Sequence, residues 1–168
     1  MNSKGQHYRI KHIVGHRKAN DVASGPDWDK FVIALFAFTP SKRTDRRGLA
    51  ALPARYPRIF PGGLLPWGFE MHPGWTRLME LLCSRIDEVL QQAPDAKMQV
   101  HQVKEKFGTL RFYYQLDGAD ESVRDAIASS VKQAEYASSM CCELCGQRGE
   151  TGSREGWLTT LCPQCAEL

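Results

Sequence analysis

The end of the chain reads CCELCGQRGETGSREGWLTTLCPQC over residues 141–165 and holds five of the six cysteines. Two CxxC pairs stand out in it, Cys142 with Cys145 and Cys162 with Cys165, separated by a 16-residue spacer. A CxxC turn makes two sulfurs converge, so two such turns joined by a short hairpin can complete a tetrahedral four-thiolate site. The spacing therefore predicts a bound metal ion near the C-terminus.

Structural zinc is the interpretation that this stretch favours. Gly146 suits the sharp turn of a knuckle, and the segment WLTTL (157–161) is typical of a strand that returns to the second pair. A redox CxxC should open a helix, whereas this cluster is expected to follow one. An iron–sulfur cluster would also accept four thiolates, but a ribbon-like hairpin favours zinc. The predicted ligands, with Cys141 as a spare, are Cys142, Cys145, Cys162 and Cys165.

Composition places the chain among ordinary globular proteins. It has 168 residues, of which 42% are hydrophobic and 24% charged, close to the usual values. No apolar run reaches the roughly 18 residues of a membrane span, and the first residues lack the apolar core of an export signal. We therefore expect a cytoplasmic protein with no membrane contact, in a compartment where clustered cysteines bind metal more often than they form disulfides.

The charge is unevenly distributed along the chain. Residues 1–58 carry twelve Lys and Arg against four acidic residues, whereas residues 59–168 carry ten against fifteen. A basic first third suits a nucleic acid or an acidic protein surface as partner, although a solvated N-terminal segment would look the same. The candidate partner-binding residues in this part are Arg9, Lys11, Arg17, Lys18, Lys42, Arg43, Arg46 and Arg47.

The pattern of apolar residues predicts an α+β fold, with a small antiparallel sheet, two packed helices and a C-terminal zinc ribbon or knuckle. We expect three segments: a basic segment with one or two strands (1–48), an α+β core (49–140) and a zinc-binding module (141–168). Residues 30–39, KFVIALFAFT, are interpreted as a buried strand of the same sheet. Residues 49–73 are rich in Pro, Gly and large apolar side chains, which indicates an ordered connection that covers the core with little regular structure.

Within the core, a helix is predicted over residues 74–93, because its apolar side chains recur at helical spacing, with Cys83 as a small core residue. A β-hairpin is predicted over 98–116, turning at Phe107 and Gly108, and a second helix over 121–140. In the hairpin we expect the side chains on one face of each strand to alternate inward. Met98, Val100 and Gln102 should share one face of the first strand, and Leu110, Phe112 and Tyr114 should share the core face of the second.

The hairpin also carries a dense group of cations and aromatics. Lys104, Lys106 and Arg111 surround a turn flanked by Phe107 and Tyr113. Exposed aromatics with cations would suit recognition of a nucleic acid or a protein. The alternative is ordinary packing, with cross-strand ion pairs over a core face, and the alternation of Leu110, Phe112 and Tyr114 favours it.

Catalytic patterns are sparse. Gln102 and Lys104, with Glu70 or Glu80 elsewhere, loosely match a metal-dependent nuclease site, yet magnesium chemistry needs two or more converging carboxylates. We find no phosphate-binding glycine loop and no HExxH motif. No small-molecule substrate is evident, and we expect a non-catalytic protein.

Several of these motifs resemble a family of small uncharacterised bacterial and phage proteins. The resemblance runs from about Tyr56 to the end of the chain, and in relatives the last ligand often looks like His where this chain has Cys165. It implies a mobile-element accessory protein and no particular reaction. The matching residues are Tyr56-Pro57, Gly68-Phe69-Glu70, Gly74-Trp75, 102–113 (QVKEKFGTLRFY), 142–146 (CELCG) and 157–162 (WLTTLC).

Together these observations predict a zinc-binding accessory protein of phage or mobile-element type in the cytoplasm of a bacterial host. It would bind a macromolecular partner such as a host protein complex, for example as an inhibitor of a defence complex. A direct DNA- or RNA-binding module is the alternative, and a metal-dependent nuclease is the second alternative.

Overall fold

The computed structural model describes residues 26–37 and 46–168. Six of the candidate partner-binding residues (Arg9, Lys11, Arg17, Lys18, Lys42 and Arg43) lie outside the described residues, as does any N-terminal strand before residue 26. The elements follow in the order α2 (Pro26–Phe36), α3 (Arg47–Arg55), β1 (Phe69–Glu70), the 3₁₀ helix η1 (Pro73–Trp75), α4 (Thr76–Gln92), β2 (Lys97–Lys106), β3 (Thr109–Asp117), α5 (Glu121–Ser138), β4 (Glu150–Arg154), β5 (Trp157–Leu161) and α6 (Pro163–Ala166).

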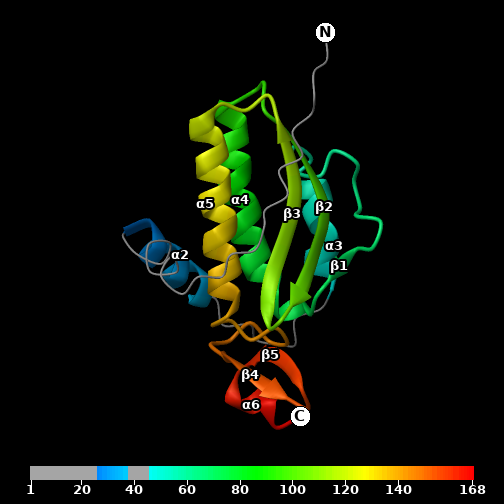
Figure 1. Cartoon of the computed structure of the whole chain (residues 1–168), viewed down its shortest axis with the longest axis vertical. Helices are drawn as coiled ribbons and strands as arrows, with labels where there is room; N and C mark the ends of the chain where they lie inside the picture. Colours follow the sequence, from blue (N-terminus) through cyan, green and yellow to red (C-terminus); the bar gives the residue numbers. More distant parts are fainter. Residues whose placement is uncertain (1–25, 38–45) are drawn as a thin grey trace.

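The fold is α+β, as the sequence predicts. β2 and β3 form the antiparallel hairpin, and the short strand β1 adds a parallel edge, with Phe69 paired to Val103. α4 and α5 run side by side along this sheet, and a second sheet of β4 and β5 closes the chain below it (Figure 1). None of the helices within the described ranges is long and apolar enough to cross a membrane.

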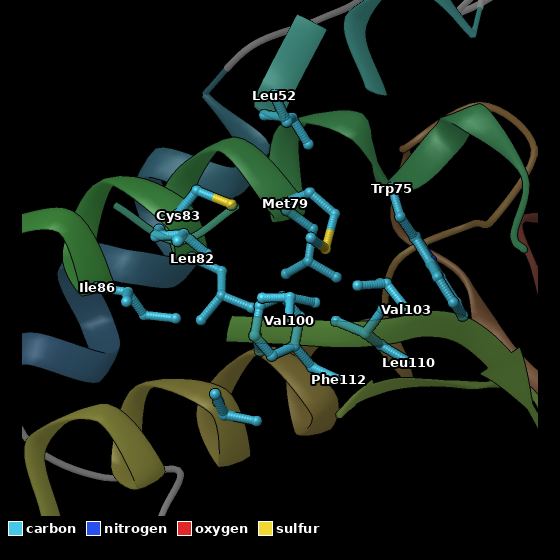
Figure 2. Close-up of a cluster of buried hydrophobic side chains, with 14 of the residues drawn as sticks. Leu52, Trp75, Met79, Leu82, Cys83, Ile86, Val100, Val103, Leu110 and Phe112 are labelled. Atoms are coloured by element: carbon cyan, nitrogen blue, oxygen red, sulfur yellow. The ribbon is translucent and has the colours of Figure 1, made fainter. Parts of the chain in front are cut away.

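The core lies between α4, α5 and the hairpin. Side chains of α4 such as Met79, Leu82 and Ile86 meet those of β2 and β3, with Leu52 of α3 on the other side of α4 (Figure 2). All four are completely buried. Cys83 belongs to this cluster, as predicted, and its burial raises the pKa of its thiol. It is a residue of the core.

The predicted strand over residues 30–39 is wrong, because residues 26–36 form the helix α2. Pro26 and the acidic first turn suit a helix N-terminus. Trp28, Phe31 and Leu35 then fall on one buried face. Trp28 packs against Tyr136 of α5, with 5.5 Å between ring centroids. A short, continuous apolar run does not distinguish a strand from a buried helix, and here tertiary packing on α4 and α5 decides.

The connection before α4 is ordered and covers the core, as predicted, through the buried side chains of Ile59, Phe60 and Leu65. It is more regular than predicted, since residues 47–55 form the helix α3 despite Pro53. Two of its large apolar side chains do not cover the core: Leu64 is 70% exposed and Trp67 is 75% exposed.

The hairpin is confirmed, with one correction to its register. A bulge between Val100 and Gln102 leaves His101 unpaired and exposed, so Val103 enters the core in place of Gln102. Both turn residues have positive φ, 57° for Phe107 and 75° for Gly108, which gives the tight two-residue turn that antiparallel strands prefer.

α5, predicted over 121–140, is confirmed over 121–138 and also closes the free edge of β3. The Ser138 hydroxyl oxygen accepts a hydrogen bond from Leu110 N–H at 2.8 Å, and Glu135 Oε1 accepts one from Phe112 N–H at 3.2 Å. An edge strand leaves its N–H groups open to another chain. Here the neighbouring helix supplies the acceptors, which fixes α5 along the hairpin.

Replacing Ser138 with Ala should destabilise the fold, because Leu110 N–H would stay buried without a partner. A buried donor that loses its acceptor costs about 1–3 kcal/mol. Ser139→Ala is the matched control, since that hydroxyl bonds only to the carbonyl of Tyr136, one turn back. Urea unfolding of the two variants measures the difference. Equal stability of both would contradict the edge-closing role of Ser138.

Candidate metal centre

Four cysteines converge at the C-terminal end, as the spacing predicts. Their sulfur atoms all lie within 4.8 Å of one another, and Cys145 Sγ is 3.6 Å from Cys162 Sγ. They form the one group of metal-ligating side chains found in the described part of the chain. Cys141 is not part of it and is completely buried nearby. The members of the group are Cys142, Cys145, Cys162 and Cys165.

Each CxxC pair is shaped by backbone hydrogen bonds. In the first knuckle Gly146 N–H donates to the Cys142 carbonyl at 2.8 Å, and Gly146 takes a φ of 78°, which favours glycine. In the second, Cys162 stands at the N-cap of α6, where Cys165 N–H donates to its sulfur at 3.4 Å. Between the pairs, β4 and β5 form an antiparallel hairpin, so the expected strand over 157–161 is present.

The pKa values of the thiols and the repulsion between their thiolates bear on metal binding. Burial raises the pKa of Cys145 to about 11. Burial also acts on Cys162, but hydrogen bonds from Cys165 N–H and from the neighbouring thiols lower its pKa overall. Metal ligation needs thiolates, and four of them so close together repel one another. The donor set suits a tetrahedral ion such as Zn²⁺, which would then have no open position for a substrate.

The module is attached to the core at two places. Trp75 Nε1 donates to the Cys141 carbonyl at 2.7 Å, and Gly74 N–H donates to the Glu143 carbonyl at 2.8 Å. At the tip of the β2–β3 hairpin, the Thr160 hydroxyl donates to the Gly108 carbonyl at 2.5 Å. These contacts hold the cysteine module against the core directly after α5.

Glycine is required where the two bodies meet. A Cβ on Gly74 would lie 2.5 Å from the Cys142 carbonyl oxygen, and one on Gly146 would lie 2.7 Å from the Gly74 carbonyl oxygen. At the hairpin tip, a Cβ on Gly108 would lie 2.7 Å from Thr151 Cγ2. Real Cβ atoms do not approach other atoms so closely, so the backbones touch directly at Gly74 and Gly146, and the Thr151 side chain packs directly on the backbone at Gly108.

The hairpin cluster contains elements of both interpretations. Leu110 and Phe112 are core residues, but Phe107 is 63% exposed and Tyr113 is 38% exposed. Lys104 Nζ lies 5.5 Å from the Tyr113 ring centroid, and Lys106 Nζ lies 5.1 Å from that of Phe107. None of the ion pairs found within residues 26–37 and 46–168 lies on this hairpin. The expected cross-strand ion pairs are therefore absent there, and cations lie over aromatic rings instead.

The other described candidates are more scattered. Arg111 is half-buried, pairs in register with Lys104, and donates to the Leu110 carbonyl at 2.7 Å. Arg46 and Arg47 are exposed at the start of α3, where Arg46 Nη1 donates to the Phe69 carbonyl at 3.4 Å. Arg46 thus lies near β1, at the edge of the sheet next to β2.

The structure brings Glu70 beside the hairpin, as one reading of the nuclease hypothesis requires. Glu70 pairs in register with Lys104, and its Oε2 accepts a hydrogen bond from Gln102 Nε2 at 2.5 Å. Glu80 is not part of this arrangement, because it pairs with Arg55 and Arg77 on another surface.

Sequence reasoning missed a cleft of about 390 Å³ between β1, the end of the hairpin and the module. Three glutamates from different parts of the chain line it: Glu70, Glu105 and Glu143. Burial and the nearby Glu105 raise the pKa of Glu143 to about 7. No local pattern connects these three residues, since only the docking of the module places Glu143 opposite the hairpin.

Elemental analysis of the purified chain should give one zinc ion per molecule. Cys165→Ser should lower the zinc content well below one, because a serine hydroxyl is a much poorer zinc ligand than a thiolate. Cys141→Ser is the matched control and should keep one zinc ion, since this neighbouring cysteine is not part of the group. Iron in place of zinc, or equal loss in both variants, would contradict the site.

Replacing Gly74 with Ala should weaken the docking of the module. The new Cβ would clash with the knuckle backbone, and overpacking of this kind costs about 1–3 kcal/mol. Gly152→Ala is the control, because nothing lies within 4 Å of a Cβ there. Thermal unfolding of the zinc-loaded variants measures the difference, and an unchanged midpoint for Gly74→Ala would refute the close contact.

Comparison of the chain with protein-family models, with curated proteins and with solved structures finds no match. The family resemblance drawn from the motifs therefore remains an expectation. What the chain does has to follow from its own geometry: a four-cysteine cluster compatible with zinc, docked on an α+β core by direct backbone contact.

Proposed function

We propose that the chain is a non-catalytic binding protein that uses a structural zinc ion to hold its C-terminal module and acts by occupying a macromolecular partner. The observation that carries this proposal is the position of the cysteine cluster. It lies where the module meets η1 and the hairpin tip, and its four sulfurs can fill all positions of a tetrahedral ion. An ion bound in this way would stabilise the neighbouring surfaces. It would have no open coordination position at which to catalyse a reaction.

The partner-binding surface that we propose is the outer face of the β2–β3 hairpin, here called the basic hairpin face. It consists of Lys104, Lys106, Arg111, Phe107 and Tyr113. Exposed aromatics with cations are enriched where proteins bind tightly. A host protein complex is the first choice of partner, and the resemblance to phage proteins suggests a defence complex that the chain inhibits.

Direct binding of DNA or RNA is the alternative, and the same face supports it. Lys104 lies over Tyr113, and Lys106 lies over Phe107. On a single strand, such aromatics would stack bases while the lysines contact phosphates.

A metal-dependent nuclease is the second alternative, supported by the contact of Glu70 with Gln102 and its register with Lys104. Only one carboxylate takes part in that contact, whereas magnesium sites use more. Loss of DNA with added Mg²⁺, abolished by Lys104→Ala, would favour this alternative over the proposal.

The test is recovery of the partner by the tagged full-length chain from a bacterial host. The double variant Lys104→Ala/Lys106→Ala should retain at least tenfold less partner, because it removes both cations beside the exposed rings. Lys97→Ala/Lys132→Ala is the control, since it removes the same charge from the far end of β2 and from α5 and should bind normally. Equal recovery by both double variants would refute the basic hairpin face.

A salt titration separates the two kinds of partner. Binding to nucleic acid weakens steeply with salt, by about 0.9 in the slope of log K against log [salt] for each phosphate contacted in a duplex and about 0.7 in a single strand. A steep slope with random duplex or single strand would establish the nucleic-acid alternative. A protein complex recovered in the absence of nucleic acid would support the proposal.

A further inference from the structure

The cleft between the core and the module, here called the acidic cleft, is a second feature that invites a ligand. It has a volume of about 390 Å³ and opens between β1, the lower end of the hairpin and β5. Carboxylates outnumber cations among the side chains that line it. The residues relevant here are Glu70, Glu105, Glu143, Arg46, Trp157 and Leu158.

Glu143 is the decisive residue in this cleft. Only 5% of it is exposed, and it lines the cleft. Its backbone is fixed on both sides, because Glu143 N–H donates to the Thr160 carbonyl at 2.9 Å and Gly74 N–H donates to the Glu143 carbonyl. Within the described part of the chain, its carboxylate has no hydrogen-bond or ion-pair partner. Its carboxylate oxygens are not among the buried atoms without a partner, so they face the open cleft, where their lone pairs can accept from a bound donor.

Thr159 also lines the cleft and carries an unsatisfied polar atom. Thr159 Oγ1 is buried and finds no hydrogen-bond partner among the described residues. The other two glutamates are held in place by one oxygen each. Glu105 Oε1 accepts from Gly108 N–H at 2.6 Å, and Glu70 Oε2 accepts from Gln102. Their remaining lone pairs can still accept from a ligand.

The wall beside these acceptors is apolar and open. Trp157 is 77% exposed and Leu158 is 44% exposed, and both line the cleft from β5, the strand that pairs with β4. A flat indole next to carboxylates suits the alkyl stem of a basic side chain, and it can attract the cation itself across its ring face.

We infer that the acidic cleft binds an arginine or lysine side chain of a protein partner. An organic cation fits better than a metal ion, because within residues 26–37 and 46–168 only the four cysteines converge closely enough to hold one. A guanidinium group, with five N–H donors in a plane, can reach carboxylates that lie apart. The inference goes beyond the proposed function, since it concerns the cleft that borders the basic hairpin face at Glu70, the residue in register with Lys104.

The test is an NMR titration of the zinc-loaded full-length chain with a capped Ala-Arg-Ala peptide. The amide signals of Glu143 and Thr159 and the indole signal of Trp157 should shift and saturate. The same peptide with citrulline keeps the shape of arginine but lacks the charge, and it should bind at least tenfold more weakly. Equal shifts with both peptides, or none with either, would overturn the inference.

Variants locate the binding within the cleft. Glu143→Gln and Glu70→Gln should each weaken binding of the arginine peptide severalfold, and Trp157→Ala should also weaken it. Glu150→Gln is the matched control on β4, outside the cleft. Because Glu143 lies inside the knuckle, the zinc content of every variant is measured. If Glu143→Gln loses zinc, the result with Glu70→Gln is the one that tests the site. Unchanged binding by Glu70→Gln would then refute the site.

Two further measurements separate this inference from its competitors. Titration with Mg²⁺ should leave the signals of the cleft in place, and shifts there without arginine binding would make it a metal site instead. Lys104→Ala/Lys106→Ala should bind the arginine peptide normally. Its failure to do so would show that the peptide contacts the basic hairpin face, so the two surfaces are tested independently.

Discussion

The position of the cysteine module on the core depends on the direct backbone contact between the first cysteine knuckle and η1, the 3₁₀ helix that precedes α4. At this contact neither Gly74 nor Gly146 has a side chain that would keep the two backbones apart. Beside it, Trp75 Nε1 donates a hydrogen bond to the Cys141 carbonyl at 2.7 Å. Such an approach buries backbone groups, which must then be hydrogen-bonded to each other. The hydrogen bond from Gly74 N–H to the Glu143 carbonyl meets that requirement. The module therefore has a defined position on the core, and a metal ion that fixes the knuckle fixes that position as well.

Elements with a long and regular apolar pattern could be predicted from the sequence. α4, α5 and the hairpin repeat apolar residues over enough turns or alternations that local pattern and tertiary packing agree. The cysteine cluster was also predictable, because metal geometry constrains ligand spacing directly. α2 was not, since the run around Phe31 and Leu35 is too short for its period to be read, and packing against Tyr136 decides its form. The bulge at His101 leaves no local signal either, yet it determines that Val103, and not Gln102, enters the core.

The candidate site likewise has a part that could be predicted from the sequence and a part that could not. The metal ligands follow from spacing within one stretch, whereas Glu70, Glu105 and Glu143 come together only through the parallel pairing of β1 with β2 and the docking of the module. Such a cleft is a property of the assembled fold, so no motif could have revealed it. The exposure of Phe107 and Tyr113 is a similar case. Alternation correctly placed Phe112 inward and Tyr113 outward, but it does not say whether a further element covers the outer face.

The position of the cysteine cluster links the metal to both proposed surfaces. The acidic cleft takes one wall from the core and the other from the module, and Glu143 stands between two ligand positions of the knuckle. The tip of the basic hairpin face touches the module through Gly108 and Thr160. Because binding of a structural metal ion is coupled to folding of the segment that holds it, an ion held by the four cysteines would stabilise the wall of the cleft that the module supplies. The hairpin would keep its own turn without the module, but it would lose the support under its tip. An ion at this position would thus support both proposed surfaces without touching either partner, the cleft more directly than the hairpin.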